Sequence, residues 1–161
     1  MVGVSFLKEV QQWLDKVEDR CDETMRQTAK EVSQRVVDRT GVSSGRLLGS
    51  WTPSIGTPAT HTYEGGPSAW IKTGEGWAKD EGVAAANKAK AKAHVEPMIR
   101  AVTESLEFSN TYYLSNNTPY AEQAENQGWS RVGPYMMMAT TAAEFDLIVA
   151  LGVQVAKKRY S

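Results

Sequence analysis

The 161-residue sequence contains one cysteine and two histidines, and its 18 Lys and Arg almost balance its 19 Asp and Glu. The single cysteine, Cys21, has no partner for an intrachain disulfide, which is typical of a chain that folds in a reducing compartment. One cysteine and two histidines give no spacing of soft ligands for zinc. A formal net charge of −1 lacks the basic excess of a chain that grips nucleic acid. We therefore expect no metal site and no cofactor.

Long hydrophobic runs are missing as well. The longest apolar stretch, 147–153, is far shorter than the roughly 20 residues that span a bilayer. Lys8 and Glu9 interrupt the N-terminus before the apolar region of a secretion signal could form. With 41% apolar and 9% aromatic residues, the chain still holds enough material for a core. We expect one soluble domain, 1–161, without a membrane partner.

Glycine and proline are absent between Val4 and Thr40, and apolar residues recur there every three or four positions. This spacing predicts one amphipathic helix over about 5–38. Such a helix is about 50 Å long, whereas a globule of this size is roughly 40 Å across. The helix would overhang its own domain, and a neighbouring copy would cover its apolar stripe. A helix that kinks and folds back onto the body is the alternative.

After the first helix, the chain is expected to alternate short strands and helices. A stretch rich in Gly, Pro, Ser and Thr predicts a loop and strand region at 41–82, with strands near 50–55, 61–63 and 70–73. Alanine and lysine then predict helices at about 83–106. Pro97 divides this segment into one helix to about His94 and a second from about Glu96.

The last third of the chain predicts a strand at about 108–115 and a short helix at 119–126. The C-terminal helix, at about 134–158, begins either at Pro134 or at a capping box formed by Thr141 and Glu144. The order of elements predicts an α+β fold. In this fold the long N-terminal helix and the C-terminal helix pack on a small, mostly antiparallel sheet.

The segment GVSSG at 41–45 matches the nucleophile-elbow pattern of hydrolases, with Ser43 as the nucleophile. A triad in chain order would need Asp80 and His94. The context differs, because a charged helix end precedes the segment and a strand-like segment follows it. An ordinary turn is the favoured interpretation, and we expect no enzyme.

Two other clusters allow two interpretations each. Lys88 and Lys92 share a helix face while Lys90 points away, which favours a solvated helix over contact with passing DNA. Three consecutive methionines, Met136 to Met138, fit either a core or an adaptable contact surface. They cannot all face one side.

Two longer segments are more specific than these clusters. The first, DRTGVSSGRLLGSW at 38–51, follows directly after the long helix. The second begins with NNTPYA at 116–121 and continues through Glu125 and Gly128 to GPYMM at 133–137. Together they resemble the tail-completion (neck) proteins of long-tailed double-stranded-DNA bacteriophages, the family that includes minor tail protein Z of lambda. The resemblance covers most of the chain and is loosest over 56–95.

This resemblance implies a structural virion protein without a catalytic centre. Identical copies are expected to form a ring at the head-tail joint, with genomic DNA passing through the lumen. The expected ring is a hexamer. Connector and tail-tube or terminator proteins would be the neighbours, and the chain would be made in the host cytoplasm. A tail terminator or other tail-tube component is the alternative within this class. An adaptor that binds another protein through its first helix is the alternative from a different class.

Contacts between copies are expected from the first helix, the loops at 56–82 and the C-terminal helix. Within the motifs, Leu47 and Trp51 can anchor the turn under the first helix, and Arg46 and Glu125 are candidates for an ion pair within or between copies. The DNA-facing candidates are Lys88, Lys90 and Lys92. The interface and structural candidates are Trp13, Arg46, Leu47, Trp51, Pro119, Tyr120, Glu125, Tyr135, Met136 and Met137.

Overall fold

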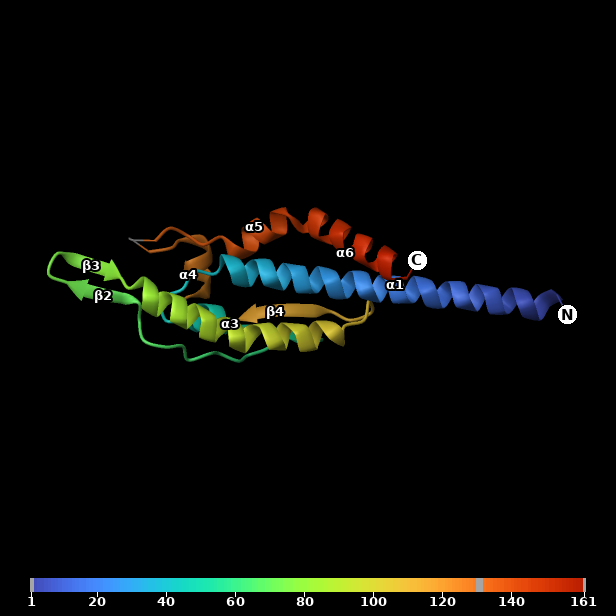
Figure 1. Ribbon diagram of the computed structural model, residues 1–161, viewed down its shortest axis with the longest axis horizontal. Coiled ribbons are helices and arrows are strands. Elements are labelled where there is room, and N and C mark those ends of the chain that lie inside the picture. Colours follow the sequence, from blue (N-terminus) through green and yellow to red (C-terminus); the bar gives the residue numbers. More distant parts are fainter. Residues whose placement is uncertain (1, 130–131, 161) are drawn as a thin grey trace.

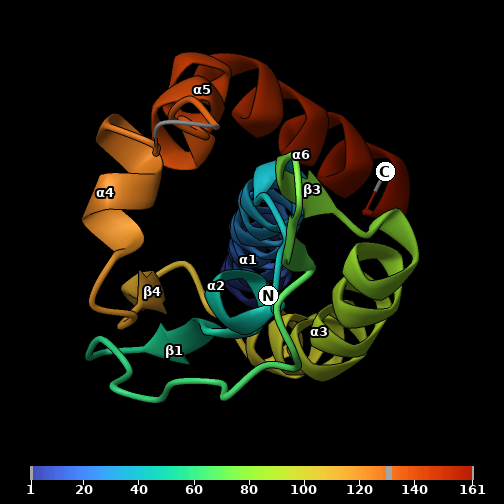
Figure 2. The same ribbon diagram turned by 90° about the vertical axis from the view of Figure 1, so that its left-hand side faces the viewer.

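The computed structural model describes residues 2–129 and 132–160, with side chains from residue 6 onward. One long helix, α1 (Val2–Arg39), runs through the molecule and projects from one end of a rounder body (Figure 1). Seen along its length, α1 is surrounded by the other helices and strands (Figure 2). The other helices are α2 (Arg46–Gly49), α3 (Glu81–Glu104), α4 (Ala121–Asn126), α5 (Met137–Ala143) and α6 (Phe145–Arg159). The strands are β1 (Trp51–Ile55), β2 (Trp70–Thr73), β3 (Gly76–Lys79) and β4 (Tyr112–Asn116).

The expected α+β fold, with a long N-terminal helix, a C-terminal helix and little sheet, is confirmed. The helix expected over 5–38 is a single unbroken helix of 38 residues, so the kinked alternative is wrong. At 1.5 Å per residue, α1 is about 57 Å long. Side chains from Phe6 to Arg20 are exposed, and burial begins at Cys21. The overhang expected from the length of the helix is therefore present.

The strands form two separate antiparallel pairs. In the first pair, β1 lies beside β4, with Trp51 opposite Asn116. In the second, β2 and β3 form a hairpin of which the sequence analysis had predicted only the first strand. Residues 61–63, expected to be a strand, have no regular structure. The Tyr63 N–H donates to the Ser50 hydroxyl, and the Tyr63 ring stacks on His94. These two contacts hold the segment against the body without a strand pairing.

Helix α3 begins with a side-chain cap, because the Asp80 carboxylate accepts the Val83 N–H at 3.0 Å. The predicted break before Pro97 is wrong, since α3 continues through Pro97 to Glu104. Proline has no backbone N–H and so cannot donate the usual helical hydrogen bond. Pro97 lies on the exposed face of α3, so this missing hydrogen bond is on the side of the helix that faces solvent. The opposite face is held in the core by Ala91, Val95 and Ile99.

The C-terminal segment forms two helices that meet at Glu144, and neither predicted start is correct. The first helix starts at Met137. Thr141 lies inside it and donates its hydroxyl to the Met137 carbonyl at 2.7 Å, so it caps nothing. The Glu144 carboxylate instead accepts two hydrogen bonds from Arg39 of α1, at 2.7 and 2.8 Å, and also pairs with Arg35. A long-range contact has replaced the predicted local one.

The core lies around the C-terminal half of α1. Helix α6 packs along this half and runs antiparallel to it, because Glu144 meets Arg39 at one end and Arg159 meets Glu23 at the other. Gly152, in the middle of α6, allows the close approach, since a Cβ there would lie 2.9 Å from the Thr28 hydroxyl. The central cluster consists of Val36, Val37, Leu47, Leu48, Trp51, Ala91, Val95, Ile99, Ala124 and Met137.

Candidate functional site

The first motif forms a turn that locks the end of α1 to β1. Gly45 has a φ of +79°, a conformation that favours glycine, and it starts the short helix α2. Leu47 and Trp51 are both buried, and the Trp51 indole N–H donates to the Thr40 hydroxyl at 2.9 Å. The Thr40 hydroxyl in turn donates to the Val36 carbonyl in the last turn of α1. These residues hold the chain's own core together, as their expected anchoring role requires.

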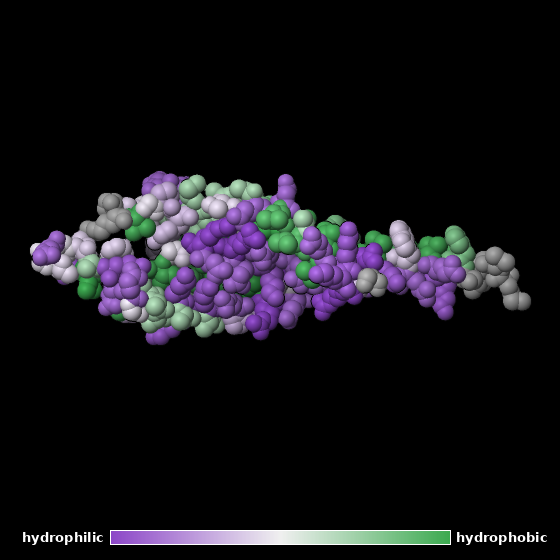
Figure 3. All heavy atoms as spheres, turned by 45° about the horizontal axis from the view of Figure 1, so that its top comes forward, coloured by the Kyte–Doolittle hydropathy of each residue, from purple (hydrophilic) through white to green (hydrophobic). Residues whose placement is uncertain are grey.

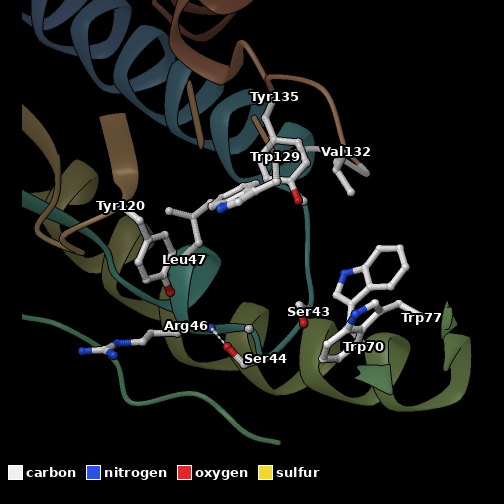
Figure 4. A pocket seen from close by; sticks show the side chains of 12 residues that line it. Ser43, Ser44, Arg46, Leu47, Trp70, Trp77, Tyr120, Trp129, Val132 and Tyr135 are labelled. Atoms are coloured by element: carbon white, nitrogen blue, oxygen red, sulfur yellow. Dashed lines mark hydrogen bonds between the residues drawn. The ribbon is translucent and has the colours of Figure 1, made fainter. Parts of the chain in front are cut away.

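A pocket of about 340 Å³ opens beside this turn (Figure 4). It includes residues of the β2–β3 hairpin, which lies at the end of the body opposite the overhang (Figure 1). Five of its twelve lining residues are aromatic, and these come from the β2–β3 hairpin, from the residue just before α4 and from the chain between α4 and α5. Burial raises the pKa values of the Tyr120 and Tyr135 hydroxyls, so both remain neutral donors at neutral pH. The lining residues are Gly41, Ser43, Ser44, Gly45, Arg46, Leu47, Trp70, Trp77, Tyr120, Trp129, Val132 and Tyr135.

Gly41 is needed for a reason that the sequence did not show. Its φ is not positive, so its backbone conformation does not require glycine. A Cβ at position 41 would lie 2.0 Å from the Tyr135 ring, so this glycine makes room for an aromatic side chain from the second motif. The two motifs, about 90 residues apart, therefore meet at Gly41 and Tyr135.

The expected ion pair between Arg46 and Glu125 is not formed within the chain. One Glu125 carboxylate oxygen accepts the N–H groups of Met138 and Ala139, both at 2.9 Å, and so satisfies the first turn of α5. The Arg46 side chain extends away from the pocket, and its backbone N–H donates to the Ser44 hydroxyl (Figure 4). Glu125 positions α5 instead of bridging to Arg46. Pro119, at the start of the same region, is exposed just before α4.

The three methionines divide between core and surface. Met137 is buried, and its sulfur lies 3.0 Å from the Thr40 hydroxyl oxygen. Met136 and Met138 are about half exposed on either side of it, and Met136 has a φ of +49°. One methionine serves the core, and two face solvent at the entry to α5.

The DNA-facing candidates lie on α3. Lys88 and Lys90 are exposed, whereas Lys92 is half-buried and pairs with Asp38 of α1. Glu96 lies 3.8 Å from the same ammonium group. Lys92 is thus an internal contact between α3 and α1, and two of the three lysines remain available to solvent.

The hydrolase triad is not assembled. The Ser43 hydroxyl lies 3.2 Å from the Ser68 hydroxyl, and Asp80 caps α3. The His94 ring stacks on Tyr63 and lies at a tilt to His61, and its Nε2 is buried without a hydrogen-bond partner. A nucleophile and its base must be within hydrogen-bond reach, so this geometry offers no activated serine.

Two apolar surfaces lie uncovered on the described part of the chain. The first is the overhang stripe, which we define as Phe6, Leu7, Val10, Trp13, Leu14 and Val17; Phe6 and Trp13 are 64% and 63% exposed. The second is the α6 stripe, which we define as Leu147, Leu151 and Val155, spaced four residues apart beside the face of α6 that packs on α1. Hydrophobic residues gather along the projecting part of α1 and over the body next to it (Figure 3).

The sequence predicted contacts from the first helix and the C-terminal helix, but among the individual interface candidates it gave only Trp13 from the overhang stripe and none from the α6 stripe. The signal was present, because Leu147, Leu151 and Val155 recur at helical spacing. The sequence analysis also missed Trp70, Trp77 and Trp129 in the pocket. These tryptophans come together only through the fold, and no local pattern marks them.

Other kinds of site are less well supported by the described residues. Within 2–129 and 132–160, no three His, Cys, Asp or Glu side chains converge as metal ligands would. No single described helix is long and apolar enough to cross a membrane, and α5 and α6 meet that standard only together, across a 62° bend. Comparison with protein-family models, with curated proteins and with solved structures found no match to this chain.

Proposed function

We propose that this chain is a structural virion protein of a tailed bacteriophage that assembles into a ring at the head-tail joint. In this proposal the ring, a hexamer, completes the neck or tail, and genomic DNA passes through its lumen. The neighbours above and below are connector and tail-tube or terminator proteins. The chain has a structural role and performs no catalysis.

The observation that carries the proposal is the pair of different apolar surfaces on one copy. A surface that contacts a copy of itself gives a closed dimer, whereas two different surfaces that contact each other give a heterologous interface. A heterologous interface that closes on itself makes a ring. The overhang stripe and the α6 stripe lie on different elements, so successive copies can use them in this way.

The two sequence motifs also support a scaffold. Leu47 and Trp51 are buried in the first motif, and Tyr135 of the second covers Gly41 of the first. Glu125 fixes the start of α5 through two backbone N–H groups. These residues are used to hold the chain in one shape, which is what a ring subunit needs.

The charge distribution suits a passage for DNA better than a grip on it. The chain is close to neutral, and Lys92 is already paired with Asp38. Affinity for DNA rises with the number of phosphates that basic side chains neutralise, so a subunit without an excess of basic side chains lets DNA slide.

The proposal is tested by adding the purified chain to tails from a phage mutant that lacks it. We expect a ring at the tail end in negative-stain electron micrographs and restored joining of heads to tails. The same preparation with Leu151→Glu tests the α6 stripe, and Ala150→Glu, on the neighbouring exposed position, is the matched control. Tails that bind no added chain, or rings that form equally well with Leu151→Glu, would contradict the proposal.

The adaptor function is the second candidate, and the exposed overhang stripe favours it to the same degree as it favours a ring. It predicts a single copy bound to a different soluble protein. Native mass spectrometry of the complexes isolated from infected cells separates the two, since a ring contains several copies of this chain.

A further inference from the structure

The overhang carries the regular seven-residue repeat of a helix that packs lengthwise against another helix. In heptad terms, Leu7, Leu14, Cys21 and Thr28 occupy position a, and Val10, Val17 and Thr24 occupy position d. Phe6 and Trp13 widen the strip at position g. The charged residues of the overhang lie outside positions a and d. We call the a and d residues the α1 seam.

The two ends of the seam differ in what covers them. At the body end, α6 lies on the seam, because Gly152 meets the Thr28 hydroxyl and the Thr24 carbonyl. This cover stops at Arg20, whose guanidinium donates to the carbonyl of Tyr160 at 2.8 Å. From Val17 back to Leu7 the same seam continues without a helix on it.

The empty part of the seam has a length and a direction. It runs from Phe6 to about Arg20, which at 1.5 Å per residue is about 22 Å. A helix that fills it must be collinear with α6, because α6 already occupies the rest of the seam. A second α1 placed parallel along the seam would run into α6 after residue 20. A second α1 placed antiparallel brings its N-terminal end up to the end of α6 without running along it, and it lies next to the loop at 107–109, which borders Leu14 and Val17.

The overhang of a second copy fits this space. It has the same length as the empty seam, and antiparallel pairing fills both empty seams at once, which is a self-complementary contact. One register places all four seam residues of each overhang in contact: Leu7 lies opposite Val17 of the second copy, and Val10 lies opposite Leu14. Sliding the second helix by one heptad toward the body of the first copy would drive its N-terminus into α6. Sliding it one heptad the other way would leave half of the empty seam exposed.

We infer that the free protein is an antiparallel dimer in which the overhangs of two copies pair along the α1 seam. The pair is centred near Gln12, with Trp13 of both copies close to the two-fold axis. The exposed side chains offer roughly 500 Å² per copy, which is at the lower end for a specific interface. We therefore expect weak pairing, with a dissociation constant on the order of micromolar.

This dimer goes beyond the proposed ring and does not depend on it. Neighbouring copies in a closed ring of more than two are related by a rotation about one axis, so their α1 helices cannot run antiparallel along that axis. The dimer therefore covers the overhang stripe before assembly and must open when a ring forms.

The dimer is tested first by sedimentation velocity of the whole chain between about 1 and 100 µM. We expect the mass to rise from that of one 17.7 kDa chain toward that of two. Leu14→Glu places a charge in the seam and should weaken the dimer at least tenfold. Gln12→Glu adds the same charge on the outer face of the overhang and should leave the dimer unchanged. A strict monomer at 100 µM, or a dimer that Leu14→Glu leaves intact, would overturn the inference.

Orientation is measured with a spin label on Lys30→Cys, in a chain whose native thiol is removed by Cys21→Ser. Lys30 is exposed and lies 18 residues from the centre of the pair. Antiparallel pairing separates the two labels by about 55 Å, whereas parallel pairing leaves them within about 25 Å. The short distance would overturn the antiparallel arrangement. Rings formed by the free protein would also overturn the antiparallel dimer, but they would support the proposed function. A dimer that never adds to tails would support the inferred dimer and contradict the proposed function.

Discussion

The two halves of α1 belong to one helix, and the seam runs from the exposed half into the covered half as far as Thr28, yet the two halves meet different surroundings. In the C-terminal half, where α6 covers the seam, the seam residues are small: Cys21, Thr24 and Thr28. In the N-terminal half, where the seam is exposed, they are the larger leucines Leu7 and Leu14, with valines between them. A globular protein buries its large apolar residues and exposes its small polar ones. The reversed order along the seam is what the inferred pairing of two overhangs would require.

The largest effect is expected from a change in the body. Leu48 is fully buried in the central cluster, so Leu48→Ala should lower the free energy of unfolding by about 3 kcal/mol through lost burial and a cavity. Leu14→Ala makes the same chemical change in the overhang, where the side chain is 46% exposed. We expect it to cost less than about 0.5 kcal/mol in the monomer. Urea unfolding at low protein concentration measures both, and equal losses would remove the distinction between the halves.

The second effect concerns the close contact of α6 with α1, which is present in the C-terminal half of α1 and absent in the N-terminal half. Gly152→Val would push two methyl groups into Thr28 and the Thr24 carbonyl, and it should destabilise the body by about 2 kcal/mol. Ala150→Val adds a β-branched residue at an exposed position of the same helix and serves as the control. Thermal unfolding of the two variants compares them directly. A Gly152→Val protein as stable as its control would mean that α6 does not lie closely on the seam.

Local patterns predicted the parts of the fold that depend on one segment. The periodicity of 5–38 was sufficient to predict α1 and its overhang, because nothing in the body can shelter a helix of that length. The strand at 50–55 and the turn before it follow from residues close to them in sequence. The α+β class then follows from the order of the elements.

The failures came where a distant residue decides the local structure. Pro97 does not end α3, because three buried residues hold the other face of the helix in the core. Thr141 and Glu144 have the spacing of a capping box, but Arg35 and Arg39 of α1 take the carboxylate. The pocket needs Trp70 and Trp129, which come from segments far apart in the sequence. Such placements require the three-dimensional arrangement that a single sequence does not state.

The third effect depends on pH. Hydrogen bonds from Arg39 and Arg35 lower the pKa of the Glu144 carboxyl below its ordinary value of 4.5. In the unfolded chain this carboxyl takes up its proton at a higher pH than in the folded chain. Its contribution to stability is therefore complete above pH 4.5 and is lost as the pH falls through the lower, folded value. The difference in melting temperature between the wild type and Glu144→Gln should accordingly be largest near pH 7 and shrink below pH 4.5. A difference that stays constant down to pH 3 would mean that the ion pairs do not hold α6 to the buried half of α1.

The smallest effect on the body is expected from removing the exposed half of α1 altogether. A chain that starts with Met followed directly by Val17 loses the whole overhang stripe except Val17. It keeps the residues of α1 that contact α6 and the residues flanking it, which are Arg20, Glu23, Thr28 and Arg35. Its helix would begin with Glu18 and Asp19, and acidic residues in a first turn are favourable because they face the positive end of the helix dipole.

This truncated chain should unfold within about 2 °C of the full chain when both are measured well below the concentration at which the full chain pairs. Raising the protein concentration should then raise the melting temperature of the full chain above that of the truncated chain. Pairing stabilises the full chain by mass action and cannot stabilise the truncated one. Calorimetry over a range of concentrations measures both quantities in one series. A truncated chain that unfolds far below the full chain at the lowest concentration would show that the overhang supports its own body. If the two melting temperatures instead stay together at every concentration, the overhang has no partner in the free protein, and its apolar stripe is used only after assembly begins.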